Sequence, residues 1–166
     1  TTDTVTVGLA DYKARMKDGQ EAIYYIIADN LKAAQNSPQL EVFKKKGIEV
    51  LLLTDPVDSF WVRTAAGFDG KPFKSVTQGT ADLDAITLKE DAKDEPAAKT
   101  DAASTARLIP ALKQALGDKV KDVRVSNRLV DSAACLVVDE YDMSLQMQRL
   151  FKAAGQPQEN LNDVEA

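Results

Sequence analysis

The stretch EAIYYIIAD, residues 21–29, decides the fold of the first half of this 166-residue chain. It is rich in strand-forming residues, and its apolar run is almost unbroken, as expected for a strand that is covered on both faces. The stretch IEVLLLTD, residues 48–55, has the same character. A third strand is expected at residues 73–76, after a tight turn at Asp69-Gly70. These three segments predict a small buried sheet.

The segments between these strands carry helix signals. Asn30 is placed to cap a first short helix, and Ser37-Pro38 begins another with a cap followed by a proline. Pro56 suits the first turn of a third helix, which is expected to end at Gly67. Because strands and helices alternate along the chain, the sequence predicts an α/β fold. We expect a small parallel three-stranded βαβαβ sandwich over residues 1–79.

The composition changes after this unit. Residues 80–104 are rich in Ala, Asp, Lys and Glu and contain few bulky apolar side chains, so they predict a linker or hinge. Residues 105–166 predict a helix, two antiparallel strands at 120–125 and 134–140, and a final helix. Pro110 fits the first of these helices only if it lies in the first turn. The second unit is therefore expected to be a truncated α+β unit, and the polar ends of the chain suggest a fragment of a larger protein.

Charge and residue usage argue against several classes of function. The net charge of −5 disfavours nucleic acid and anionic membranes as partners, because both require clustered positive charge. No apolar run approaches the length of about 20 residues that spans a bilayer. Histidine is absent, which removes Ser-His and Cys-His catalysis and most zinc sites. Cys135 is the only cysteine, so no internal disulfide can form and a reducing, cytoplasmic compartment fits best.

Three carboxylates suggest one alternative function. Asp29 and Asp55 end the first two predicted strands, and Asp58 follows closely. Ligands of α/β proteins bind at this edge of the sheet, so the three side chains could hold Mg²⁺ in a metal-binding or receiver-like module. The structural interpretation is that they end strands or begin a helix, where carboxylates are favoured. We favour the structural interpretation, because a receiver-like pocket also needs a later lysine and more than three strands.

An amphipathic helix is predicted at DMSLQMQRLFKAAG, residues 142–155, with Asp142 as its cap and Gly155 as its end. Such an apolar stripe usually packs on its own domain. Methionine, however, is flexible and polarizable, and is favoured on surfaces that adapt to many partners. Spacing alone leaves both interpretations open. The stripe consists of Met143, Met147, Leu150, Phe151 and Ala154.

Phe60 and Trp61 are adjacent aromatic residues on the helix that is predicted after Pro56. Adjacent side chains on a helix point about 100° apart, so both cannot face the same core equally. One of the two is expected to be partly exposed, and exposed large aromatic residues often mark contact sites. A shared packing role between the sheet and a neighbouring subdomain is the alternative.

Four stretches of the chain resemble the heat-shock protein 90 chaperones, in their bacterial form. The resemblance extends from about residue 9 to residue 155, and the motifs keep their order and spacing. The stretches are DYKARMKDGQEAIYYI (11–26), SPQLEVFKKKGIEVLLLTDPVD (37–58), FDGKPFKSV (68–76) and VKDVRVSNRLVDSAACLV (120–137).

The resemblance implies a place within a larger chaperone. Residues 1–79 would be the small α/β subdomain of the middle domain, and residues 105–166 the first half of the C-terminal domain. The family's nucleotide-binding domain and its catalytic arginine loop have no counterpart here, so this chain is expected not to be an enzyme and to bind no cofactor. The full-length protein would be a homodimeric ATPase that uses ATP and Mg²⁺. It would bind unfolded or partly folded client proteins, and this segment would relay conformational change between the two domains.

The resemblance also implies two client-contact areas. The helix with Met143, Met147, Leu150 and Phe151 resembles the family's amphipathic segment in the C-terminal domain, which favours a binding surface over a core face. Bacterial relatives have a second contact area, an acidic residue followed by an aromatic one, on the helix after DPVD. Here Ser59 and Phe60 occupy these positions, and Trp61 adds a further aromatic. Ser59 lacks the acidic group, so only the aromatic character is carried over.

Overall fold

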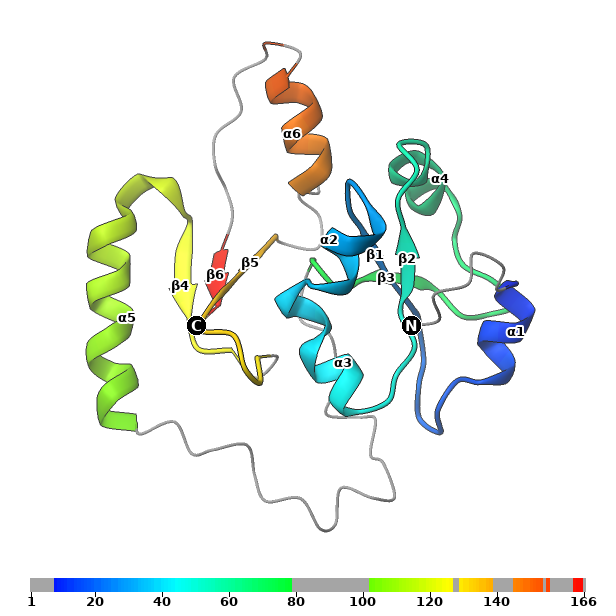
Figure 1. The fold of residues 1–166 in the computed structure, drawn as a ribbon, viewed down its shortest axis with the longest axis horizontal. Coiled ribbons are helices and arrows are strands. Elements are labelled where there is room, and N and C mark those ends of the chain that lie inside the picture. Colours follow the sequence, from blue (N-terminus) through cyan, green and yellow to red (C-terminus); the bar gives the residue numbers. More distant parts are fainter. Residues whose placement is uncertain are drawn as a thin grey trace.

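A three-stranded parallel sheet forms the first half of the computed structural model, which describes residues 8–78, 102–126, 129–138, 145–153, 155 and 163–165. The strands are β1 (Ile23–Ile27), β2 (Leu51–Leu53) and β3 (Phe73–Ser75), in the order β2-β1-β3. Tyr25 of β1 is the register partner of both Leu51 and Ser75. The central place of β1 explains its unbroken apolar run, and the predicted α/β fold is confirmed (Figure 1).

Two short helices and a 3₁₀ turn cover one face of this sheet. They are α2 (Leu31–Gln35), η1 (Pro38–Leu40) and α3 (Glu41–Lys45). The predicted cap of α2 is confirmed, because Asn30 Oδ1 accepts a hydrogen bond from the Ala33 amide at 2.8 Å. Phe43 of α3 packs edge-on against Tyr24 of β1, with ring centroids 5.0 Å apart. These elements enclose the core of the α/β unit.

A third helix, α4 (Asp58–Thr64), follows β2 and buries Ser59 and Val62. The return to β3 passes through two glycines in positive-φ conformations, Gly67 and Gly70. Gly67 is required by space as well as by conformation, because a Cβ there would overlap the carbonyl group of Lys71. Gly70 belongs to the Asp69-Gly70 turn that the sequence predicts, in which Asp69 and Gly70 have φ values of 47° and 76°.

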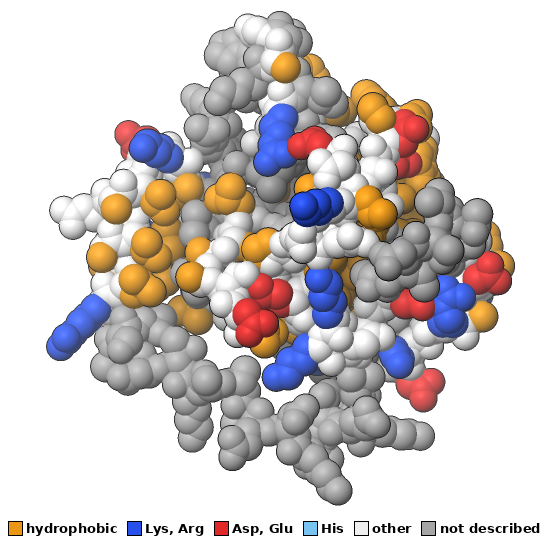
Figure 2. Space-filling view, in the orientation of Figure 1, with side chains coloured by type: hydrophobic (Ala, Val, Ile, Leu, Met, Phe, Trp, Pro, Cys, Tyr) orange, Lys and Arg blue, Asp and Glu red, His pale blue; other side chains and the backbone are white. Residues whose placement is uncertain are grey.

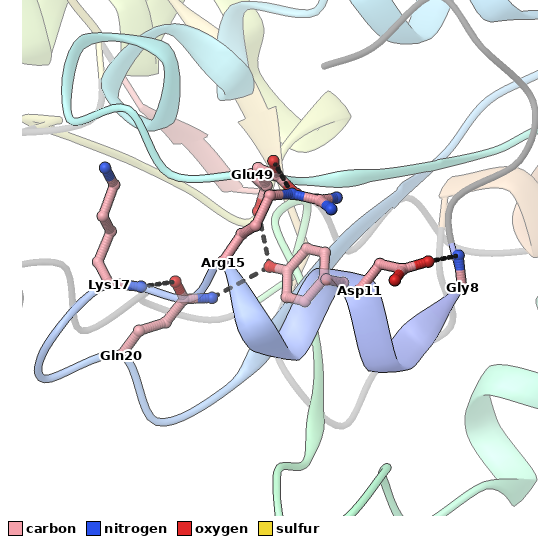
Figure 3. A network of polar contacts seen from close by, with 7 residues as sticks. Gly8, Asp11, Arg15, Lys17, Gln20 and Glu49 are labelled. Carbon is pink, nitrogen blue, oxygen red and sulfur yellow. Dashed lines mark hydrogen bonds and ion pairs between the residues drawn. The ribbon is translucent and has the colours of Figure 1, made fainter.

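A buried tyrosine fastens the first helix, α1 (Leu9–Ala14), to the sheet. The Tyr12 hydroxyl donates to the Glu49 carbonyl at 2.6 Å and accepts from Gln20 Nε2 at 3.0 Å and from the Tyr24 amide at 3.1 Å. Arg15 adds an exposed ion pair to the Glu49 carboxylate (Figure 3). Burial raises the pKa of the Tyr12 hydroxyl, although its hydrogen bonds partly oppose this effect.

The second half contains α5 (Ala102–Leu116), η2 (Gly117–Lys119), β4 (Asp122–Arg124), β5 (Cys135–Val137), α6 (Leu145–Ala153) and β6 (Asp163–Glu165). The predicted direct pairing of the two strands is wrong, because β6 lies between them in the order β4-β6-β5. Val164 is the register partner of both Val123 in β4 and Leu136 in β5. A three-residue strand in a polar tail is too short to show a period, so the sequence did not predict it.

The helix around Pro110 forms although the condition that this proline lies in its first turn is not met. Helix α5 begins at Ala102, so Pro110 lies well inside it. Pro110 is exposed, and the half-buried Leu112 and Leu116 that follow it keep the helix against the rest of the unit. Packing of these side chains offsets the hydrogen bond that proline cannot make. Within the part of the chain that the structure describes, no helix has the length and apolar character needed to cross a bilayer.

Candidate functional site

The N-terminal end of α4 presents apolar side chains to solvent. Val57 and Phe60 are 57% and 54% exposed. Trp61 is half-buried instead. Its ring packs edge-on against that of Phe73, with ring centroids 5.5 Å apart, and its Nε1 donates to Asp58 Oδ1 at 2.6 Å. The two adjacent aromatic side chains therefore divide as the helical spacing predicts, with Phe60 outward and Trp61 packed. Val57 extends this exposed surface, although its sequence context did not single it out.

Helix α6 holds part of the predicted methionine stripe. Met147 and Phe151 are half-buried, and Leu150 belongs to the same helix. Met143 lies outside the described residues. Arg149 Nη1 is 3.2 Å from Asp29 Oδ2, so α6 is tied to the end of β1 by an exposed ion pair. Partial burial is compatible with packing and with contact to a partner, and the role of the stripe stays a prediction.

The three carboxylates of the alternative function have protein partners. Asp55 Oδ1 accepts from the Val57 amide at 3.0 Å, and Asp58 Oδ2 accepts from the Asp55 amide at 3.0 Å. Asp29 pairs with Arg149. Among the described residues, no three His, Cys, Asp or Glu side chains come together as a possible metal site. The geometry supports the structural interpretation, in which two of these carboxylates stabilise the turn into α4.

A carboxylate at the start of α3 binds the second half of the chain. Glu41 Oε2 accepts hydrogen bonds from the amides of Val130, Asp131 and Ser132 at 2.7, 2.9 and 3.2 Å. Glu41 Oε1 accepts from the Ser132 hydroxyl. Partial burial raises the pKa of Glu41, but these hydrogen bonds outweigh it and lower the pKa to about 2. One side chain thus holds a whole turn of the other unit.

Two further contacts join the same surfaces. The buried Gln39 side chain donates to the Leu136 carbonyl, and the Val138 amide donates to the Thr77 carbonyl at 3.0 Å. Val138 is fully buried. We call these contacts, together with those of Glu41, the joint. Sequence reasoning missed it, because its partners lie about 60 to 97 positions apart and most of the acceptors or donors are backbone groups, which leave no pattern of residue types.

Comparisons with known proteins agree with one another. The family described as Hsp90 protein matches residues 1–165. A protein named Chaperone protein HtpG, from Albidiferax ferrireducens, is 55% identical over 98% of this chain and 24% of its own length. Proteins with the same name from Verminephrobacter eiseniae and Alkalilimnicola ehrlichii are each 56% identical, over 93% and 92% of this chain and 23% of their own lengths. The chain spans about a quarter of the length of these curated relatives.

Proposed function

Because this chain belongs to the Hsp90 protein family, we propose that it is a segment of an ATP-dependent molecular chaperone. In this proposal the segment has two roles. It contacts partly folded client proteins through exposed apolar side chains, and it relays conformational change between the middle and C-terminal domains. Residues 1–79 are then the end of the middle domain, residues 80–104 a hinge, and residues 105–166 the beginning of the C-terminal domain.

The exposure of Phe60 is the observation that carries the client-contact role. Phe60 is 54% exposed and lies beside the exposed Val57, so much of its apolar surface stays in contact with water. Such exposure adds nothing to the stability of the fold, and exposed apolar surface often marks a contact site. Trp61 on the same helix has both a ring partner and a hydrogen-bond partner, so the exposure of Phe60 is specific to its position. Through these contacts with Phe73 and Asp58, Trp61 helps to hold α4 in position. On α6, Met147, Leu150 and Phe151, with Met143 before them, would form the second contact area.

The joint supports the relay role. Its contacts connect α3, η1 and the end of β3 to residues 130–138, so a displacement of one unit is carried to the other through hydrogen bonds. A relay needs such a direct physical connection between two elements that move. Since most of the connected groups are backbone groups, a displacement would move the backbone of residues 130–138 and not a single side chain.

Other properties of the whole chaperone are proposed for parts that this chain does not include. ATP binding with Mg²⁺, ATP hydrolysis and homodimer formation would belong to the full-length protein. This segment would bind no cofactor and catalyse no reaction. We place the full-length protein in the cytoplasm, in agreement with a single buried cysteine.

Suppression of aggregation tests the contact role. The 166-residue chain should slow the aggregation of a destabilised model protein, and Phe60→Ser should weaken that protection severalfold. Leu108→Ser is the matched control, because Leu108 on α5 is 51% exposed. Apolar side chains gather over α5 in Figure 2. If exposure of any apolar side chain sufficed, both variants would weaken protection equally, and the assignment to α4 would be wrong.

The α6 stripe needs a second comparison, since its side chains are half-buried. Met147→Ser combined with Phe151→Ser is expected to reduce protection while circular dichroism shows the native helix content. Loss of structure in the double variant would assign the stripe to packing. Full protection by a folded double variant would remove α6 from the client surface and leave α4 alone.

A further inference from the structure

A cleft of about 640 Å³ lies between the two units, at the carboxyl end of the parallel sheet. Its size is within the range of small-molecule sites, and this edge of an α/β sheet is where such proteins commonly bind ligands. β1, α4, α5, the residues around β5 and Arg149 of α6 all contribute to it. Its apolar walls include Ile27, Val62, Leu112, Leu116 and Leu136. The apolar part of a ligand would therefore be covered from both units.

Ser59, a residue in the wall of this cleft, has a side-chain atom that lacks a hydrogen-bond partner in the described part of the chain. Ser59 is 2% exposed, and its Oγ is the only buried side-chain polar atom in the described part of the chain that makes no hydrogen bond. A buried unpaired hydroxyl costs about 1–3 kcal/mol, so its presence calls for an explanation. Ser59 lines the cleft, but its Oγ exposes almost no area. Rotation of the side chain about its Cα–Cβ bond would present the hydroxyl to a ligand in the cleft, which could then accept the missing hydrogen bond.

A positive charge accompanies this hydroxyl. Arg63 also lines the cleft and lies four residues after Ser59, on the same face of α4. No ion pair among the described residues involves Arg63. Arg63 lies close enough to Tyr25 for its charge to oppose the effect of burial, which raises the pKa of the Tyr25 hydroxyl. By contrast, the other charged side chains of the cleft, Asp29 and Arg149, neutralise each other.

We propose that the cleft binds a small carboxylic acid with an apolar body, whose carboxylate is held by the Ser59 hydroxyl and the Arg63 guanidinium. The apolar body would lie between the leucines of α5 and Leu136. This site is distinct from the exposed surface of Phe60, which points about 100° away from Ser59 on α4. Since both units line the cleft, a bound ligand would favour the arrangement of the two units in which the contacts of the joint are formed.

Octanoate and octan-1-ol test this assignment, because they share the apolar chain and differ in the carboxylate. Titration of the 166-residue chain, followed by its amide NMR signals, should show octanoate binding about tenfold more tightly, as expected for a hydrogen bond to a charged group. The shifts should concentrate at Tyr25, Ser59 and Leu136. An acetylated trileucine with a free C-terminus, compared with its amide, shows whether a peptide carboxylate is accepted as well as a fatty acid.

Two variants assign the contacts. Arg63→Met should weaken octanoate about tenfold and leave octan-1-ol within about twofold, since it removes only the charge-assisted contact. Arg15→Met is the control, because it removes an exposed arginine outside the cleft. Ser59→Ala removes a hydroxyl without partners, so the variant should fold and bind octanoate severalfold more weakly. Equal affinity for octanoate and octan-1-ol, no binding of either carboxylate, or unchanged octanoate affinity in Arg63→Met would overturn the proposal.

Discussion

Replacing Glu41 by glutamine should loosen the joint without unfolding the α/β unit. The carboxylate accepts three amide hydrogen bonds and one hydroxyl hydrogen bond from residues 130–132. A pKa lowered from 4.5 to about 2 corresponds to about 3 kcal/mol of interaction if solvent did not screen it. Glu41 is only half-buried, so screening reduces this to about 1–2 kcal/mol. The neutral amide of glutamine can retain part of the hydrogen bonding but none of the charge.

Amide hydrogen exchange measures this change locally. A loss of about 1–2 kcal/mol should speed exchange at Asp131 and Ser132 about 5- to 30-fold, whereas amides in β1 should keep their protection. Glu49→Gln is the matched control, because Glu49 forms an exposed ion pair with Arg15 in the same unit and makes no contact of the joint. Exchange at Asp131 within twofold of the parent chain would refute the assignment of this energy to Glu41.

The pH dependence has a definite sign. A carboxylate whose folded-state pKa is lowered contributes its full stabilisation above its ordinary pKa of 4.5 and loses it as pH falls toward 2. After correction for intrinsic exchange rates, protection of Ser132 should therefore be constant from pH 7 to about pH 5.5 and decline below about pH 4.5. In Glu41→Gln this decline should be absent, because the titrating group has been removed.

Two remaining predictions concern the α/β unit. Tyr12→Phe removes the hydroxyl that Glu49, Gln20 and the Tyr24 amide share, and should lower the free energy of unfolding by about 1–3 kcal/mol, seen as a lower urea midpoint at constant slope. An unchanged midpoint would mean that water replaces the hydroxyl. Gly67→Ala places a Cβ against the Lys71 carbonyl at a φ of 142° and should cost at least about 1–3 kcal/mol, seen as a lower melting temperature. A melting temperature equal to that of the parent chain would contradict the close approach.

The sheet could be predicted from the sequence because its signals are local. β1 is central and covered on both faces, so burial requires the unbroken apolar run at residues 21–29. Asn30 and the Asp69-Gly70 turn act on neighbours one to three positions away, and such short-range chemistry is visible in a sequence. The outward position of Phe60 relative to Trp61 follows from helical geometry in the same way.

The rest depends on contacts that residue types do not encode. Glu41 binds amides, which every non-proline residue possesses, so nothing in residues 130–132 marks them as its partners. The position of β6 between β4 and β5 is likewise decided by pairing over three residues. The position of Ser59 and Arg63 on one wall of the cleft becomes meaningful only when residues of the second unit form the opposite wall. Sequence patterns report which face of an element is buried, but not what covers it.

The chemistry of the joint has a mechanical consequence. Its hydrogen bonds from residues 130–132 converge on one carboxylate, and hydrogen bonds weaken steeply with distance and angle. A displacement of this turn by one or two ångströms would therefore break them together and not one by one. Gln39 and the Val138 amide, which hold the following residues, would resist the same displacement. A connection that is either fully formed or fully broken has two positions, which is the physical property that the proposed relay between domains requires.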